Sequence, residues 1–409
     1  MLNLIPLAGK SLSIWVALLV STSLAHESPW AFLWTAPILL FASVLIAWAA
    51  ESAQYYIAQG FALAILAWLQ TLPEFAVEAV LAWRQQTPLL LSNLTGALRL
   101  LTGVGWPLIY CTAAISYRAR RRKPMRVLRL DPHDSIQVIS LTLVLVWIFV
   151  IFFKASLGLI DAAILIGMYV GYLLLLNRVP PEKVEEIEEM ERIPRAVVKA
   201  RPAVRNIAIV GMFLVGGAAI FFVAEPFLGS LLSVATAVGI SQFVAVQWIA
   251  PFVSEFPEKV SAFYWARTID KAPMALMNMV SSNINQWTLL AAMLPIIFSI
   301  SVGAPHSIPF DRQQALELLM TAGQSLLGAL LLMDLKLSWW EAGLLFVMWA
   351  VQFGFSISPA PIAFRVHEGI TLLYFAWCAA QIIRLLVRGT IPEAITAFRQ
   401  IQTAPRVAH

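Results

Sequence analysis

Long apolar runs constrain the fold of this chain more than any other feature of its sequence. A helix needs roughly 20 apolar residues to cross about 30 Å of hydrocarbon at about 1.5 Å per residue. Hydrophobic residues make up 60% of the chain and charged residues only 12%, which excludes an ordinary soluble domain. The runs are 4–25, 31–49, 53–84, 88–115, 135–153, 156–177, 204–224, 229–267, 270–301, 314–333, 338–357 and 366–388. We therefore predict an all-α polytopic membrane protein with about 11–12 transmembrane helices.

Basic residues indicate which side of the membrane each loop occupies. Two loops, 118–129 and 178–205, are rich in Lys and Arg, and alternate threading of the runs places them on the same side. Cytoplasmic loops carry such an excess, so we predict a cell-membrane protein with both termini in the cytoplasm. The formal charge of +5 then needs no nucleic-acid partner. Residues 1–25 fit either an uncleaved helix or a signal peptide that ends near Ser23-Leu24-Ala25.

Two segments of the chain repeat the same order of residues. The shared residues are Pro73, Glu74, Pro88 and Asn93 in the first segment, and Pro257, Glu258, Pro273 and Asn278 in the second. Threading places the turn inside the first segment on one side of the membrane and the corresponding second turn on the other. The two halves are therefore inverted repeats, which indicates a transporter with a site near the bilayer midplane.

The repeats divide the chain into five parts. We predict an N-terminal helix at 1–30, a first repeat of five helices at 31–177 and a charged cytoplasmic linker at 178–203. A second repeat of five helices follows at 204–357, and an additional transmembrane helix and tail occupy 358–409.

Four carboxylates lie inside apolar runs. Glu74 and Glu78 are spaced i, i+4, and Glu255 and Glu258 are spaced i, i+3, so each pair shares a helix face. A charge at the centre of a membrane helix costs about 2.5–3.5 kcal/mol on insertion scales, which favours a functional role. The alternative is that each Pro-Glu pair starts a helix at a membrane surface.

Oxygen atoms near these carboxylates favour a site for hard cations. The prolines before Glu74 and Glu258 free backbone carbonyls, and Thr71 and Ser254 add hydroxyl groups. Polar residues of the following helices are either further ligands or packing contacts. These residues are Asn93, Asn278, Ser282 and Asn283. Arg99 and Lys259 bring positive charge close to the site.

The two segments resemble the sodium/calcium exchanger membrane region of the cation/calcium exchanger superfamily. That family has Gly-Thr-Ser-x-Pro-Glu followed by Gly-Asn-x-x-Gly-Ser-Asn in each of two inverted five-helix repeats. Here the first repeat has residues 69–74, Leu-Gln-Thr-Leu-Pro-Glu, and the second has residues 253–258, Val-Ser-Glu-Phe-Pro-Glu. The resemblance implies that Glu74 and Glu258 bind Ca²⁺, with Asn93, Asn278 and Ser282-Asn283 in the family's polar positions. Ala97-Leu98 replaces the Ser-Asn of the first repeat.

The resulting hypothesis is a secondary antiporter that exchanges Ca²⁺ for Na⁺ or H⁺ by alternating access. Its partners would be the lipid bilayer and small cations. Cys111 and Cys378 lie in separate runs and the five His have no paired spacing, so we predict no cofactor beyond the transported ions. The alternatives are a transport-inactive sensor or scaffold and an intramembrane enzyme that uses the paired glutamates. The enzyme is less favoured because no nucleophile or metal motif accompanies them. The oligomeric state is open.

Overall fold

The computed structural model describes residues 28–53, 71–177, 187 and 190–403. Residues 1–27 of the predicted N-terminal helix and residues 178–186 and 188–189 of the charged linker lie outside the described residues. The first half contains η1 (Pro29–Ala31), α2 (Phe32–Ala53), α4 (Leu72–Trp83), α5 (Thr87–Leu100), η2 (Leu101–Gly105), α6 (Trp106–Arg121), β1 (Val127–Arg129), η3 (Pro132–Asp134), α7 (Ser135–Lys154), β2 (Ser156–Leu157) and α8 (Leu159–Leu176).

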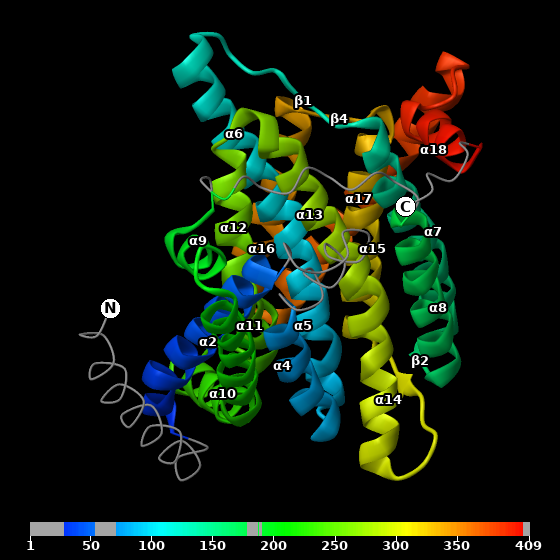
Figure 1. The fold of residues 1–409 in the computed structure, drawn as a ribbon. Helices are drawn as coiled ribbons and strands as arrows, with labels where there is room; N and C mark the ends of the chain where they lie inside the picture. Colours follow the sequence, from blue (N-terminus) through cyan, green and yellow to red (C-terminus); the bar gives the residue numbers. More distant parts are fainter. Residues whose placement is uncertain (1–27, 54–70, 178–186, 188–189, 404–409) are drawn as a thin grey trace.

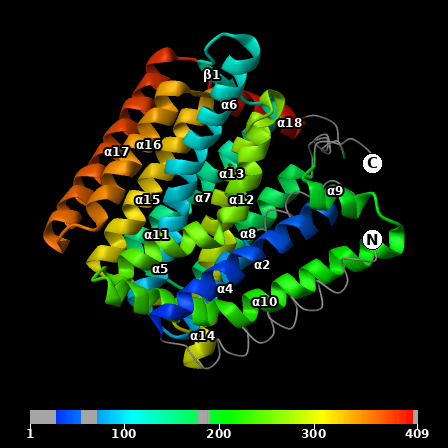
Figure 2. The ribbon, with the colours of Figure 1, turned by 90° about the vertical axis from the view of Figure 1, so that its left-hand side faces the viewer.

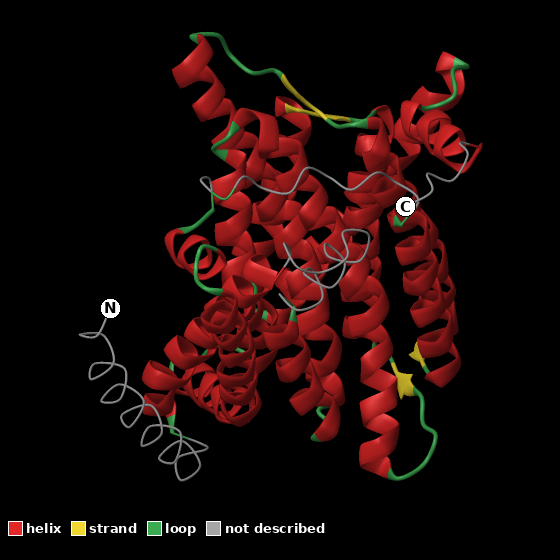
Figure 3. Ribbon diagram, viewed as in Figure 1, coloured by secondary structure: helices red, strands yellow, loops and turns green. Residues whose placement is uncertain are grey.

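The second half contains α9 (Arg192–Val198), α10 (Pro202–Ala237), α11 (Gln242–Ser254), α12 (Phe256–Ala266), η4 (Ile269–Lys271), α13 (Ala272–Asn285), η5 (Gln286–Leu290), α14 (Ala291–Val302), β3 (Ile308–Pro309), α15 (Arg312–Leu331), η6 (Leu332–Asp334), β4 (Lys336–Ser338), α16 (Trp339–Ser356), α17 (Ala360–Arg388) and α18 (Glu393–Thr403). In the described part of the chain, 8 helical segments are long and apolar enough to cross a membrane. The all-α polytopic fold is confirmed (Figure 1, Figure 3).

One predicted helix boundary is wrong. The runs 204–224 and 229–267 suggest a break at residues 225–228, but α10 continues through Pro226 to Ala237. Proline removes one backbone hydrogen bond and bends a helix without always ending it. The break lies after Ala237, where Gly239 has a φ of +73° that favours glycine.

The two repeats interrupt their helices at corresponding positions. In both repeats a helix begins just before the Pro-Glu pair, at Leu72 and Phe256, and the next helix begins just before a second proline, at Thr87 and Ala272. That next helix changes to a π-helical turn after Leu100 in the first repeat and after Asn285 in the second. Such turns are rare in helices and are frequent at functional sites.

Two short sheets show that the repeats are inverted. β1 of the first repeat pairs antiparallel with β4 of the second, with Val127 opposite Ser338, and β2 of the first pairs with β3 of the second, with Ser156 opposite Pro309. The sheets lie at opposite ends of the helical bundle (Figure 1, Figure 3). β1 follows α6 and β3 follows α14, the corresponding helices of the two repeats, yet these two strands lie at opposite ends of the bundle. The two repeats are therefore inverted.

The helices α2 and α10 form a pair along one side of the molecule. They run obliquely across the other helices (Figure 2) and pack together through a Thr35 to Ser230 hydroxyl contact of 3.0 Å and stacked rings of Phe32 and Phe227. Their buried apolar residues form a core with Val77 of α4 that is separate from the main core. The pair therefore contacts the carboxylate-bearing helix α4 through an apolar surface.

Candidate functional site

The paired glutamates lie in the first turns of two helices. Glu74 follows Pro73 at the start of α4, and Glu258 follows Pro257 at the start of α12. Proline is well placed in a first turn, and a carboxylate there interacts favourably with the helix dipole. Both glutamates start helices, as the membrane-surface alternative requires. However, their exposed fractions are 0% and 2%, so they lie in the interior of the protein.

Amide side chains hold the carboxylates of the first repeat. Glu78, one turn after Glu74 on α4, accepts a hydrogen bond of 3.0 Å from Asn93 Nδ2 of α5. Glu74 Oε2 accepts one of 2.9 Å from Gln286 Nε2, which lies in the π-helical turn of the second repeat. Thr71, just before α4, accepts a 2.8 Å hydrogen bond from Asn285. The site of the first repeat is therefore bonded directly to the second.

The second repeat adds two carboxylates and a cation. Glu255 lies between α11 and α12, where it forms a buried ion pair with Lys259 one turn later. The same Gln286 Nε2 that contacts Glu74 also donates to Glu255 Oε1 at 2.6 Å. One amide group thus bridges carboxylates from the two repeats. Ser282 lies beside Glu258 on the facing helix α13, but forms no hydrogen bond of normal geometry there.

The electrostatics of this site are strongly negative. Glu74 interacts electrostatically with Glu78, Glu255 and Glu258, and also with Lys259. Four ionised carboxylates and one ammonium group give a formal charge of about −3, a charge that a buried site cannot hold without bound cations or protons. One oxygen each of Glu74, Glu78 and Glu258 is buried without a hydrogen-bond partner. These oxygens are free to accept a proton or coordinate a cation.

The carboxylates do not form a ready-made metal centre. Within the described residues, no three Asp, Glu, His or Cys side chains converge closely enough to hold a metal ion. Instead, Gln286 donates hydrogen bonds to Glu74 and Glu255, and Lys259 forms an ion pair with Glu255. Tight coordination of a divalent ion by these groups would require some of those contacts to open.

The other predicted ligands have varied surroundings. Asn278 Nδ2 is buried and has no hydrogen-bond partner, so it donates to none of the four carboxylates. Asn283 donates to the carbonyl of Met279 and accepts from Thr102 at 3.4 Å, so its side chain contacts the π-helical turn of the first repeat. The Ser254 hydroxyl donates to the carbonyl of Ala250 in its own helix. The hydrogen bonds of Asn283 and Ser254 therefore join parts of the helices to one another and not to a carboxylate.

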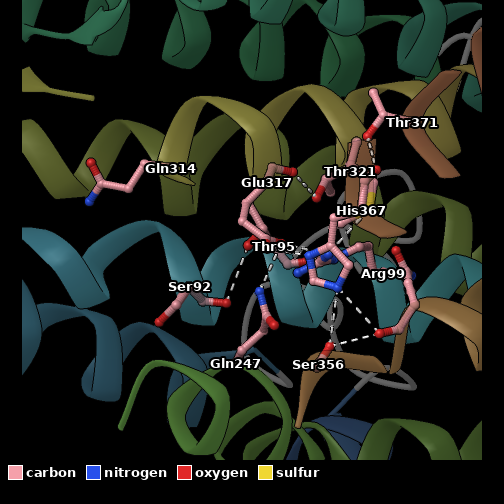
Figure 4. A network of polar contacts seen from close by, with 12 residues as sticks. Ser92, Thr95, Arg99, Gln247, Gln314, Glu317, Thr321, Ser356, His367 and Thr371 are labelled. Atoms are coloured by element: carbon pink, nitrogen blue, oxygen red, sulfur yellow. Dashed lines mark hydrogen bonds and ion pairs between the residues drawn. The ribbon is translucent and has the colours of Figure 1, made fainter. Parts of the chain in front are cut away.

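Arg99 lies in a different cluster from the one predicted. Its guanidinium pairs with Glu317 of α15 at 2.6 Å, and Gln247 Nε2 of α11 donates to the same carboxylate oxygen at 2.9 Å (Figure 4). Glu317 Oε1 lies 2.9 Å from His367 Nδ1 of α17. Glu317 thus neutralises the charge of Arg99, and only Lys259 of the two predicted basic groups contacts a site carboxylate.

Three important residues escaped the sequence analysis. Gln286 has no counterpart in the first repeat, where Leu101 occupies the corresponding position at the start of the π-helical turn, so the repeat pattern could not reveal it. Glu317 and His367 are ionisable residues inside apolar runs, and this signal could have found them.

Two inverted repeats whose buried carboxylates meet between them are the architecture of a membrane transporter. Comparison with known proteins identifies the family. The sequence matches the family described as "Sodium/calcium exchanger protein" over residues 28–177 and 208–358. The chain therefore belongs to the sodium/calcium exchanger family, which confirms the predicted resemblance. Members of this family are cation antiporters that need no cofactor, and they are not enzymes.

Solved structures share the fold. The structure of the H⁺/Ca²⁺ exchanger CAX is 31% identical, with a TM-score of 0.82 over 95% of each chain. Native YfkE is 18% identical, with a TM-score of 0.62 over 84% of this chain and 98% of its own. The sodium-calcium exchanger NCX_Mj is 19% identical, with a TM-score of 0.52 over 79% of this chain and 96% of its own. A search of curated protein sequences found no match.

Proposed function

We propose that this protein exchanges Ca²⁺ for H⁺ across the membrane, with Glu74 and Glu258 as the central ligands. The observation that carries the proposal is the set of four buried carboxylates, two from each inverted repeat, that interact electrostatically. Ca²⁺ prefers carboxylate and carbonyl oxygens. Protons compete for the same oxygens, so occupancy by one ion excludes the other and couples the two flows.

Similarity favours H⁺ over Na⁺ as the counter-ion. The H⁺/Ca²⁺ exchanger structure is 31% identical to this chain, whereas the sodium-calcium exchanger structure is 19% identical and supports the fold alone. The unpartnered oxygens of Glu74, Glu78 and Glu258 are also suited to accept protons.

Alternating access would involve the α2–α10 pair. These helices pack on α4 through apolar side chains such as Val77, which allow sliding more readily than a hydrogen-bonded surface. One ion pair also joins the two elements, between Arg84 after α4 and Glu225 of α10, but both side chains are exposed, and such surface pairs contribute little to stability. We infer that movement of the pair past α4 opens the carboxylate site to either side in turn.

A transport-inactive sensor is the second candidate. The observation that favours it is the Lys259–Glu255 ion pair, because a tethered ammonium group takes the place of a transported cation at one carboxylate. Such a protein would bind cations without moving them.

The test is ⁴⁵Ca²⁺ uptake into proteoliposomes under an imposed pH gradient, an imposed Na⁺ gradient or neither. We expect uptake with the pH gradient, and its loss in Glu74→Gln and in Glu258→Gln. The matched control is Glu393→Gln, which removes an exposed carboxylate of α18 and should leave uptake unchanged. Uptake with the Na⁺ gradient alone would show that Na⁺, and not H⁺, is the counter-ion. Ca²⁺ binding without uptake under any gradient would show that the protein is a transport-inactive sensor.

A further inference from the structure

A second buried cluster of ionisable groups lies apart from the four carboxylates. Arg99 of α5, Glu317 of α15 and His367 of α17 have exposed fractions of 0%, 2% and 5%. They form a continuous chain of contacts, because Glu317 binds the guanidinium of Arg99 with one oxygen and the imidazole of His367 with the other (Figure 4). Helix α17 begins after residue 358, where the family match ends.

The charges of this cluster are balanced without a second cation. The guanidinium of Arg99 and the carboxylate of Glu317 have opposite charges, so this ion pair is neutral as a unit. Arg99 is held further by the carbonyl of Thr95 at 3.0 Å and by the ring of Trp248 at 5.0 Å. His367 supplies the imidazole of this cluster, a ring that exists in a neutral and a cationic form.

Hydrogen-bond geometry around His367 suits both protonation states. Nδ1 lies 2.9 Å from the Glu317 carboxylate, which is an acceptor, so we assign a proton to this nitrogen. Nε2 lies 3.3 Å from the carbonyl of Gln352, an acceptor, and 3.4 Å from the hydroxyl of Ser356, a possible donor. The hydroxyl already donates to the Gln352 carbonyl at 2.8 Å. A protonated Nε2 donates to that carbonyl, and an unprotonated Nε2 accepts from Ser356 once the hydroxyl turns away from the carbonyl.

The remaining neighbours of His367 carry no competing charge. Helix α16 contributes only the uncharged Gln352 and Ser356, and α11 contributes Gln247 through Glu317. On α17 itself Thr371 donates to the His367 carbonyl, and Tyr374 faces Arg99 with its hydroxyl unpartnered. On α17 the charged residues nearest in sequence are Arg365, which is exposed, and Glu368, which pairs with Arg312 of α15 at 3.3 Å.

We propose that His367, Glu317 and Arg99 form a second proton-binding site, by which protonation of His367 strengthens the attachment of α17 to the exchanger core. Glu317 is the fixed acceptor, and its ion pair with Arg99 balances its charge. The added proton binds at His367 Nε2, where it gives a second charge-assisted hydrogen bond. Because Arg99 and Gln247 extend from α5 and α11, the site connects α17 with the helix of Asn93 and the helix that precedes Glu255.

The test is ¹⁵N NMR of protein labelled at histidine, recorded from pH 5 to 9, which reports the protonation of each ring nitrogen directly. It does not depend on ion transport, so its failure is distinguishable from failure of the proposed function. We expect one imidazole that keeps Nδ1 protonated throughout while Nε2 gains a proton, and this signal should vanish in His367→Asn. His133→Asn, at an exposed position of η3, should leave it unchanged.

Two further variants should change the proton affinity of His367 in opposite directions. They also keep the proposal testable if His367→Asn does not fold. Glu317→Gln removes the negative acceptor and should weaken proton binding by at least about tenfold. Ser356→Ala removes the donor to the unprotonated ring and should strengthen it by about threefold or more. A His367 signal that keeps one protonation state across the pH range, or that shifts in neither variant, would overturn the proposal.

Discussion

Gly96 is the position at which the smallest substitution should do the most damage. It lies on α5 one turn after Asn93 and one turn before Arg99. A Cβ at this position would lie 1.8 Å from the backbone oxygen of Gln247 and 2.7 Å from its carbonyl carbon. Real Cβ atoms essentially never approach other atoms within 3.0 Å. The glycine therefore sets the separation of α5 from α11.

The expected destabilisation follows from this overlap. In Gly96→Ala, α5 and α11 must separate by about 1.2 Å, the difference between 3.0 and 1.8 Å. Backbone atoms cannot rotate away as a side chain does, so the cost lies near the upper end of the range for overpacking, about 3 kcal/mol. The better helix propensity of alanine returns about 1 kcal/mol. The free energy of unfolding should therefore fall by about 2 kcal/mol.

The assay is SDS-induced unfolding of the detergent-solubilised protein, with Gly167→Ala as the matched control. Gly167 is also helical, on α8, but nothing lies within 4 Å of a Cβ there. Transport by Gly96→Ala should fall as well, because displacement of α5 moves Asn93 away from Glu78. If both variants unfold at the same SDS fraction as the parent protein, close contact between α5 and α11 does not limit stability and the reasoning is wrong.

Three other predictions concern the buried charges. Arg99→Leu leaves the charge of Glu317 uncompensated and should lower the free energy of unfolding by about 3–5 kcal/mol. Adding Glu317→Leu should restore most of this stability. A double variant less stable than Arg99→Leu would contradict the prediction. Lys259→Met removes the cation paired with Glu255 and should raise Ca²⁺ affinity at pH 8 by at least about tenfold in calorimetric titration, whereas Lys259→Arg should change it little. Protons compete with Ca²⁺ for the carboxylates, so affinity of the parent protein should fall from pH 8 to pH 6 with proton release on binding; equal affinities would show that the site carboxylates do not exchange protons.

Sequence alone predicted the membrane class, the inverted repeats and the family. Hydrophobic length and the missing N–H of proline are local properties, so apolar runs and Pro-Glu pairs mark helices and their interruptions directly. The Pro-Glu pairs at Glu74 and Glu258 both start helices, and both glutamates are buried. The break expected at residues 225–228 was wrong because Pro226 lies inside α10, where packing of the adjacent Phe227 against Phe32 of α2 supports the helix.

The partners of the buried charges were decided by the tertiary structure. Gln286 reaches Glu74 across 212 positions of the chain, and no spacing in the sequence announces a contact between segments that far apart. Arg99 lies only six residues after Asn93, yet its side chain turns to Glu317 and not to the site that Asn93 contacts. On a helix, residues six apart point in different directions, and which neighbour each one meets depends on how other helices pack around it.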